Sequence, residues 1–385
     1  MRDDCNGNCL ACGKCANFAI LDSFRAGGAY AEPREGFGIA VDIGTTTVVL
    51  ALLDLNGGCV MARHSFMNPQ RVFGPDVISR IQASNEGHVA EMRRLIIRAI
   101  CAGLSELLAA GGVLPGRVAH IAIAGNTTMT YLLLGFPCGS LGAYPFRPAY
   151  ALAGPYAFAE VFGMEGITCP LFIFPWFTAF VGGDVLAGLL HVAQEGKKPF
   201  LLIDMGTNGE MGLMEENRLI VTSTAAGPAF ESGRGGASGV IHGLAELVRA
   251  GAVDETGLLL EGEGTFTQKQ IRDLQLAKSA VRTGLEILLE TAGMSYGDLG
   301  AVYLAGGIGQ AMDVRDAVEI GLLPRGLRQI AMAAGNSSLG GAALYLGAPG
   351  AALADITSLR AAAREINLAE HPRFNDCFME YMVFE

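Results

Sequence analysis

The feature that most restricts the fold of this 385-residue chain is a short pattern that occurs twice. Residues 38–53 read GIAVDIGTTTVVLALL, and residues 200–213 read FLLIDMGTNGEMGL. In each segment an apolar run enters a tight turn at glycine, which predicts a β-hairpin. Three pairs of residues coincide when the segments are aligned: Asp42 with Asp204, Gly44 with Gly206, and Thr45 with Thr207. Two such hairpins far apart in the chain indicate a duplicated fold.

The tips of both predicted hairpins carry groups suited to an anion. Their backbone N–H groups and hydroxyls can converge on a phosphate, and Asp42, just before the first tip, could hold hydrated Mg²⁺ beside it. The candidate binding residues are Gly44, Thr45, Thr46 and Thr47 in the first hairpin and Gly206, Thr207, Asn208 and Gly209 in the second. An ordinary hairpin with an aspartate explains either segment taken alone, and the chain has no Walker A sequence.

Two predicted helices that follow the hairpins are rich in small residues. Residues 179–193 open at a Gly-Gly pair and continue as an apolar helix, and residues 340–348 have the same character. Glycine and alanine would let these helices approach closely, although two ordinary buried helices are the alternative. Between them, residues 301–309 read AVYLAGGIG, which predicts a buried strand that runs into Gly306 and Gly307. A backbone without side chains there can pass close to a flat ligand.

A long amphipathic helix is predicted over residues 267–292, because its apolar residues recur at helical spacing. Thr267 and Gln270 form a capping box at its start, and Gly293 ends it. Lys278 lies on this helix, and we place it near a nucleotide whose phosphates the two hairpins would bind. A solvated lysine is the alternative.

Four cysteines lie within the first fifteen residues in the pattern C-x3-C-x2-C-x2-C: Cys5, Cys9, Cys12 and Cys15. Thiolates so close together can converge on one iron–sulfur cluster, most simply of the 4Fe-4S type. Structural zinc more often uses two ligand pairs separated by a longer loop, and a second pair is missing here. Zinc and an unmetallated segment remain the alternatives. Residues 22–36 contain glycine, proline and charges and read as a linker.

Composition excludes several classes of protein. Apolar residues make up 51% and charged residues 17%, which allows two packed domains and excludes wholesale disorder. A net charge of −11 argues against a nucleic-acid groove. No apolar run approaches the roughly 18 residues of a membrane span, and the polar N-terminus does not resemble a signal peptide. We therefore expect a cytoplasmic protein that binds neither nucleic acid nor membrane.

These parts resemble the superfamily of actin, sugar kinases and heat-shock chaperone ATPases. That superfamily has a first phosphate hairpin, a connecting helix, a second phosphate hairpin, an adenosine Gly-Gly motif and a second connecting helix. All five occur here in that order over residues 38–348. The closer resemblance is to the ATP-dependent reductive activators of corrinoid proteins. The segments that carry it are DIGTTTVV, NPQRVFGPDVISRI (68–81), AGNTTM (124–129), VGGDVLAG, DMGTNGE, GPAFE, TQKQIRDLQLAKSAVRTG (267–284), YLAGGIG, IGLLP, AGNSSLGGA and HPRF (371–374).

The resemblance implies an α/β protein with a duplicated actin-like ATPase fold, in which two ribonuclease-H-like halves surround a nucleotide cleft. The expected parts are a Cys-rich head and linker (1–36), a first half (37–195), a second half (196–348) and a C-terminal helical segment that packs back on the first half (349–385). It also implies that ATP binds with Mg²⁺ held through water by Asp42 and Asp204. Asp184 would orient or activate the attacking water. Glu210 is a second candidate, with an ion pair to arginine as its alternative.

The implied activity is ATP-driven electron transfer from the Cys-rich head to a corrinoid protein or another low-potential metalloprotein. The resemblance also allows a homodimer. Two features depart from the family. Its members usually carry a ferredoxin-like domain with a two-iron cluster, where this chain has a short Cys-rich head. The stretch after Glu231 is shortened and lacks the family's Cys-Gly-Ser-Gly turn. A small-molecule kinase, or a nucleotide-binding regulatory scaffold with a zinc head, are the alternative functions.

Overall fold

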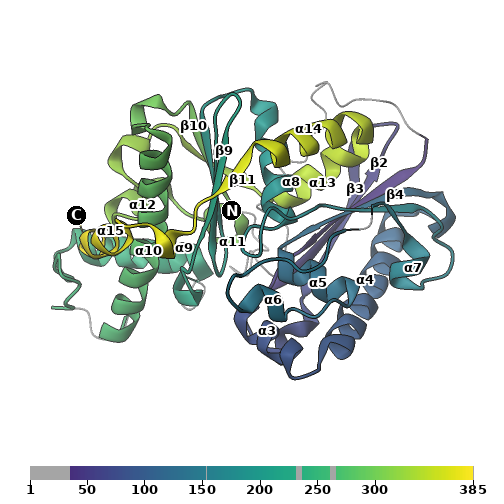
Figure 1. Ribbon diagram of the computed structural model, residues 1–385, viewed down its shortest axis with the longest axis horizontal. Helices are drawn as coiled ribbons and strands as arrows, with labels where there is room; N and C mark the ends of the chain where they lie inside the picture. Colours follow the sequence, from purple (N-terminus) through teal and green to yellow (C-terminus); the bar gives the residue numbers. More distant parts are fainter. Residues whose placement is uncertain (1–34, 153, 231–235, 261–265, 385) are drawn as a thin grey trace. The chain divides into compact units, whose positions relative to one another are not determined.

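The computed structural model describes residues 35–152, 154–230, 236–260 and 266–384. These residues form two compact units, each built on one mixed sheet (Figure 1). The first unit comprises the described residues up to Gln194 together with Asn336–Ala361. The second comprises Glu195–Gly335 and the chain from Ala362 onward. Within the described residues, no helix combines the length and the apolar character needed to span a bilayer.

The first sheet has the strand order β3-β2-β1-β4-β6-β5. Its strands β1, β2 and β3 form an antiparallel meander, and β4 and β6 add in parallel beside β1. The strands are β1 (Phe37–Ile43), β2 (Thr47–Asp54), β3 (Cys59–Met67), β4 (Val118–Gly125), β5 (Tyr156–Ala157) and β6 (Pro170–Ile173). The helices of this unit are α3 (Val77–Asn85), α4 (Val89–Gly111), α5 (Thr127–Leu134), α6 (Gly139–Gly142), α7 (Phe158–Phe162), α8 (Gly183–Val192), α13 (Ser337–Gly347) and α14 (Pro349–Ala362).

The second sheet repeats this plan in the order β11-β10-β7-β8-β9-β12. Again three antiparallel strands are followed by two parallel ones, beside β7. The strands are β7 (Phe200–Met205), β8 (Gly209–Met214), β9 (Leu219–Thr224), β10 (Ala301–Ala305), β11 (Ala331–Gly335) and β12 (Ala363–Glu365). The helices are α9 (Gly236–Arg249), α10 (Gln268–Ala292), α11 (Gly306–Gly309), α12 (Val314–Glu319) and α15 (Phe374–Glu380). The shared order confirms the predicted duplication into ribonuclease-H-like halves.

The two faces of the first sheet are covered by different helices. Residues of odd number on β1, such as Ile39 and Val41, pack in one core cluster with apolar residues of α4. Gly38 faces the other way, and a Cβ there would lie 3.2 Å from Leu346 of α13. The alternation of side chains along a strand therefore places α4 on one face and α13 on the other.

Helices α8 and α13 pack closely, as their small residues predict. A Cβ on Gly341 would lie 1.9 Å from the carbonyl oxygen of Ala187 in α8, so only glycine fits at this crossing. The helix begins at Ser337, three residues before the predicted start, because Asn336 caps it. Its location corrects the expected domain boundaries. The sequence analysis places this helix in the second half, but α13 packs in the first unit, because composition predicts a buried helix without indicating which sheet it covers.

The C-terminal region is divided between the two units. Helix α14 belongs to the first unit, in line with the expected packing of residues 349–385. From Ala362 onward that expectation is wrong, because β12 pairs with β9 and α15 packs on α10. The sequence offered no signal for this change of unit, because β12 has only three residues.

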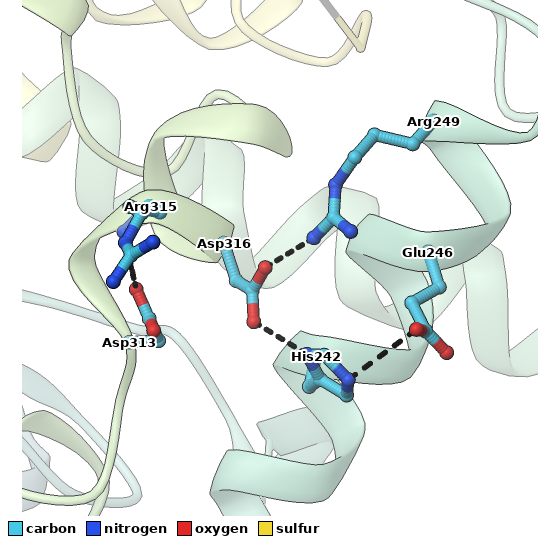
Figure 2. Close-up of polar contacts among 6 residues, drawn as sticks. All are labelled: His242, Glu246, Arg249, Asp313, Arg315 and Asp316. Carbon is cyan, nitrogen blue, oxygen red and sulfur yellow. Dashed lines mark hydrogen bonds and ion pairs between the residues drawn. The ribbon is translucent and has the colours of Figure 1, made fainter.

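In the second unit, helices α9, α10 and α12 lie together on one side of the sheet (Figure 1). Helix α10 starts at the predicted capping box of Thr267 and Gln270 and ends at Gly293 with φ +71°. Figure 2 shows how α9 is tied to α12. The buried carboxylate of Asp316 binds Arg249 and lies 2.7 Å from Nδ1 of His242. This contact raises the pKa of His242.

Candidate functional site

The tip of the first hairpin presents backbone donors. The amide of Gly44 donates to the carbonyl oxygen of Thr47 at 3.0 Å, which closes the turn between β1 and β2. A Cβ on Gly44 would lie 2.7 Å from that oxygen, so glycine is required there. Among the described residues, no hydrogen-bond partner receives the amide N–H of Thr45 or Thr46. These two donors are the ones that an anion at the tip would meet.

Asp42, one residue before the end of β1, is held by the start of α13. Its two carboxylate oxygens accept hydrogen bonds from Nδ2 of Asn336 at 2.7 Å and from Oγ of Ser338 at 2.9 Å. Burial nevertheless raises the pKa of Asp42, and the two hydrogen bonds only partly offset this. The carboxylate is therefore fixed in direction by neutral donors and keeps the capacity to attract a cation.

Asp184 lies in the first turn of α8, as the sequence predicts. Its Oδ1 accepts from the amide of Val185 at 2.9 Å. Burial raises the pKa of Asp184 to about 7, and the charge of Asp42 adds to this effect. Within the described part of the chain, neither aspartate forms an ion pair with lysine, arginine or histidine. A buried carboxylate without a counter-charge, such as Asp42, suits a divalent cation bound through water, and a second one nearby, such as Asp184, suits a proton acceptor.

The raised pKa of Asp184 makes a prediction about stability. The Asp184 carboxyl has an ordinary pKa of 3.8, which we take for the unfolded chain, and a pKa of about 7 in the folded protein. Between these values the folded protein binds more protons than the unfolded chain, so the free energy of unfolding falls as the pH rises from 4 to 7. We expect nucleotide-free Asp184→Asn to exceed wild type by up to about 4 kcal/mol at pH 8 and to match it near pH 4. Urea unfolding at both pH values measures this; an equal difference at both would contradict it.

Two asparagines that the sequence analysis did not single out as site residues perform the same task. Asn126 caps α5 by accepting from the amide of Met129 at 2.9 Å, and its Nδ2 donates to Oγ1 of Thr45 at 3.0 Å. Asn336 caps α13 by accepting from the amide of Leu339 at 2.7 Å, and its Nδ2 donates to Asp42. In each case the capped amide fixes the carboxamide, so the NH₂ group points at the first hairpin. The repeated sequences AGNTT and AGNSS were the available signal.

The second hairpin differs from the first by one residue at its tip. Met205 pairs with Gly209, which leaves a three-residue turn, and the amide of Gly206 donates to the carbonyl oxygen of Asn208 at 2.9 Å. Asp204 pairs with Glu210 across the two strands, so both side chains leave the same face of the sheet. The alignment of Asp42 with Asp204 therefore holds up to the turn and not beyond it.

Gly306 lies directly against this second hairpin. It adopts φ +76°, and a Cβ there would lie 2.3 Å from Oδ1 of Asp204 and 2.5 Å from the carbonyl oxygen of Met205. The strand β10 does run into Gly306 and Gly307, as predicted. The close approach of the hairpin explains why the first of these residues is glycine, independently of any ligand.

Comparison with known proteins identifies the family. The RACo middle region matches residues 37–195, and the C-terminal domain of RACo, the ASKHA domain, matches residues 198–237 and 260–385. The corrinoid activation enzyme RamQ of Eubacterium limosum is 30% identical, over 90% of this chain and 70% of that protein. The chain belongs to the family of reductive activators of corrinoid proteins.

Two further relatives support this family assignment. A solved reductive activator for corrinoid, iron–sulfur protein superposes with a TM-score of 0.81 at 29% identity, over 92% of this chain and 67% of that one. The "[Co(II) methylated amine-specific corrinoid protein] reductase" of Methanosarcina barkeri is 26% identical over 47% of this chain and 45% of that protein. Both hairpins of this activator lie within the residues that the family models match.

Lys278 of this activator has a different environment from the one we predicted. Its side chain is buried, and Nζ donates to the carbonyl oxygens of Tyr381 at 2.7 Å and Val383 at 2.6 Å. The ammonium also lies 5.2 Å from the centre of the Phe384 ring. The lysine therefore anchors the segment after α15, and this geometry does not support a place near the nucleotide. Its spacing on α10 indicated burial but not the partner.

The four cysteines of the activator's head, Cys5, Cys9, Cys12 and Cys15, lie outside the described residues. Among the residues that are described, no group of three or more histidine, cysteine, aspartate or glutamate side chains is arranged to hold a metal ion. Two of the remaining cysteines, Cys138 and Cys169, are buried, and burial raises the pKa of each thiol to about 11. They behave as small apolar side chains.

Proposed function

We propose that this protein is an ATP-dependent reductive activator that drives electron transfer to a corrinoid protein. The observation that carries the proposal is the arrangement around the first hairpin, where the amide N–H groups of Thr45 and Thr46 have no partner among the described residues and the strand before them carries Asp42, whose charge also acts on Asp184. Membership of the reductive-activator family supports the choice of a corrinoid protein as the partner.

The residues of the first unit fit a magnesium nucleotide. The amides of Thr45 and Thr46 are donors for phosphate oxygens, and the Thr45 hydroxyl is oriented by Asn126. Bound Mg²⁺ would supply positive charge against both the phosphates and the two carboxylates. The hydrogen bonds from Asn336 and Ser338 orient the Asp42 carboxylate, which supports our assignment of Asp42 to such an ion through water. In the second unit we propose Asp204 and the turn residues 206–209 for the corresponding task.

Asp184 is the residue we propose to accept a proton from the attacking water. A general base works best when its pKa lies near the working pH, and the pKa of about 7 meets this condition. Glu210 on β8 is the second candidate.

We propose that the Cys-rich head delivers the electron. Its four thiolates are suited to one iron–sulfur cluster, the source of one-electron reducing chemistry when bound. About 1.4 kcal/mol shifts a one-electron potential by about 59 mV, so a few kcal/mol from a nucleotide-driven change would alter the driving force usefully. A head that holds zinc instead would favour the regulatory scaffold.

Removing either hairpin aspartate is expected to abolish the stabilisation of the protein by Mg–ATP. A ligand at 100 times its Kd stabilises a folded protein by about 2.7 kcal/mol, which is readily seen as a shift in Tm. Asp42→Ala and Asp204→Ala should each lose this shift. Glu91→Ala, which alters an exposed carboxylate on α4, should keep it.

The same thermal measurements test whether the nucleotide binds at the two hairpins. Shifts of wild-type size in both aspartate variants would refute the assignment of the nucleotide to the hairpins. Transfer of the γ-phosphate to an added sugar, rather than to water, would favour the small-molecule kinase.

A further inference from the structure

Arg80 of α3 is a buried cation placed directly behind the tip of the first hairpin. Its side chain is 0% exposed. Nη2 donates to the carbonyl oxygen of Thr45 at 2.6 Å, and Nε donates to the carbonyl oxygen of Gly74 at 3.1 Å. Its third contact is Nη1 to Sδ of Met129 at 3.1 Å. The guanidinium thus touches the hairpin through one backbone oxygen.

This arginine has no anionic partner at contact distance among the described residues. Burial lowers its pKa to about 10, and the more distant charge of Asp76 only partly opposes this, so it remains protonated at neutral pH. A buried charge is costly unless an opposite charge compensates it. Arg80 contacts the tip of the hairpin through the carbonyl oxygen of Thr45, so an anion bound at that tip would supply an opposite charge nearby.

Asn68 holds the same tip from the same side. Asn68 is also fully buried, and its side-chain Nδ2 donates to the carbonyl oxygen of Gly44 at 2.9 Å. Its backbone amide donates to the carbonyl oxygen of Thr46 at 2.9 Å. With Arg80 on Thr45, three consecutive carbonyl oxygens of the tip are bound by the segment 68–80. A peptide whose carbonyl is held on one side presents its N–H on the other, which explains why the amides of Thr45 and Thr46 are left without partners.

We propose that Arg80 and Asn68 are positioning residues that turn the first hairpin into a donor surface for nucleotide phosphates, with Arg80 also supplying positive charge behind it. The inference rests on the proposed nucleotide-binding function and adds two residues to it. Neither residue touches the nucleotide in this proposal; both act through the backbone of residues 44–46.

The test compares Arg80→Gln with Arg93→Gln. Arg93 is a matched control, because its guanidinium also donates to two backbone carbonyls of the same unit, those of Leu133 and Val161, away from the hairpin. Titration calorimetry with Mg–ADP should show Kd raised about 10- to 100-fold by Arg80→Gln and unchanged by Arg93→Gln. Adenosine, measured as a competitor of a fluorescent ADP analogue, should bind Arg80→Gln as it binds wild type.

Two further variants guard against a folding defect. Arg80→Lys keeps the charge and should restore part of the lost Mg–ADP affinity. Asn68→Asp keeps the oxygen that accepts from the amide of Gln70 but loses the donor to Gly44, and it should also raise the Kd for Mg–ADP.

Three outcomes decide the matter. Unchanged Mg–ADP affinity in Arg80→Gln and Asn68→Asp overturns the inference and leaves the proposed function standing, and so does an equal loss of Mg–ADP and adenosine binding. Failure of the wild-type protein to bind any nucleotide overturns both.

Discussion

Asp184→Asn is expected to slow ATP hydrolysis about 100-fold or more while leaving the Kd for Mg–ATP within a few-fold of wild type. The asparagine keeps the shape of the side chain and can keep the hydrogen bond from the amide of Val185. It cannot accept a proton from water. Because Asp184 belongs to neither hairpin, the donors that we assign to the phosphates stay in place.

The pH dependence sharpens this prediction. Hydrolysis by wild type should increase with pH as Asp184 loses its proton, with a midpoint at or below the pKa of about 7, since bound Mg²⁺ lowers the pKa of a nearby carboxyl. The residual rate of Asp184→Asn should lack this step. Steady-state hydrolysis at saturating Mg–ATP, between pH 5 and 9, measures both. Equal loss of binding and hydrolysis would instead make Asp184 a structural residue at the start of α8.

Removal of residues 1–36 is expected to end electron transfer to a corrinoid partner completely while leaving Mg–ATP binding intact. All four head cysteines are lost with this segment, whereas both hairpins lie downstream. The measurements are iron and acid-labile sulfide content and visible absorbance of the full-length and shortened proteins, prepared without oxygen. Cobalt reduction in an added corrinoid protein is followed by its absorbance.

A narrower variant controls for the loss of the whole segment. Replacing Cys9 and Cys12 with serine should remove the iron from an otherwise full-length chain and give the same loss of electron transfer. One equivalent of zinc without iron in the anaerobic full-length protein would contradict the redox role of the head and favour the regulatory scaffold.

The parts of the fold that the sequence predicted are those encoded by local signals. The two hairpins, the capping box of Thr267 and the stop at Gly293 depend on residue types within a few positions of one another. The close packing of α8 with α13 is a distant contact, but the small residues within each helix indicated it. The family resemblance then predicted how these parts are arranged in a duplicated fold. Asp184 was placed correctly at a helix start because the Gly-Gly pair before it marks that start.

What the sequence did not predict depends on contacts between distant residues. Asn336 lies 294 positions from the carboxylate it holds, and no local pattern encodes such a contact. Arg80 and Asn68 lay inside a recognised segment, but nothing in that segment indicated that its donors bind the hairpin carbonyls. For Lys278, helical spacing showed that the residue faces inward, while its partners come from the end of the chain.

The passage of the chain back into the first unit at Asn336 has a consequence for biosynthesis. Asp42 leaves the ribosome 294 residues before Asn336, which at about 5–20 residues per second is an interval of about 15–60 s. Throughout that time the first sheet lacks the helix that packs against Gly38. We therefore expect the nascent half-molecule to expose the apolar face of the first sheet that α13 later covers, and to lack the Asn336 donor that orients Asp42. A fragment that ends before Asn336 would lack α13 in the same way.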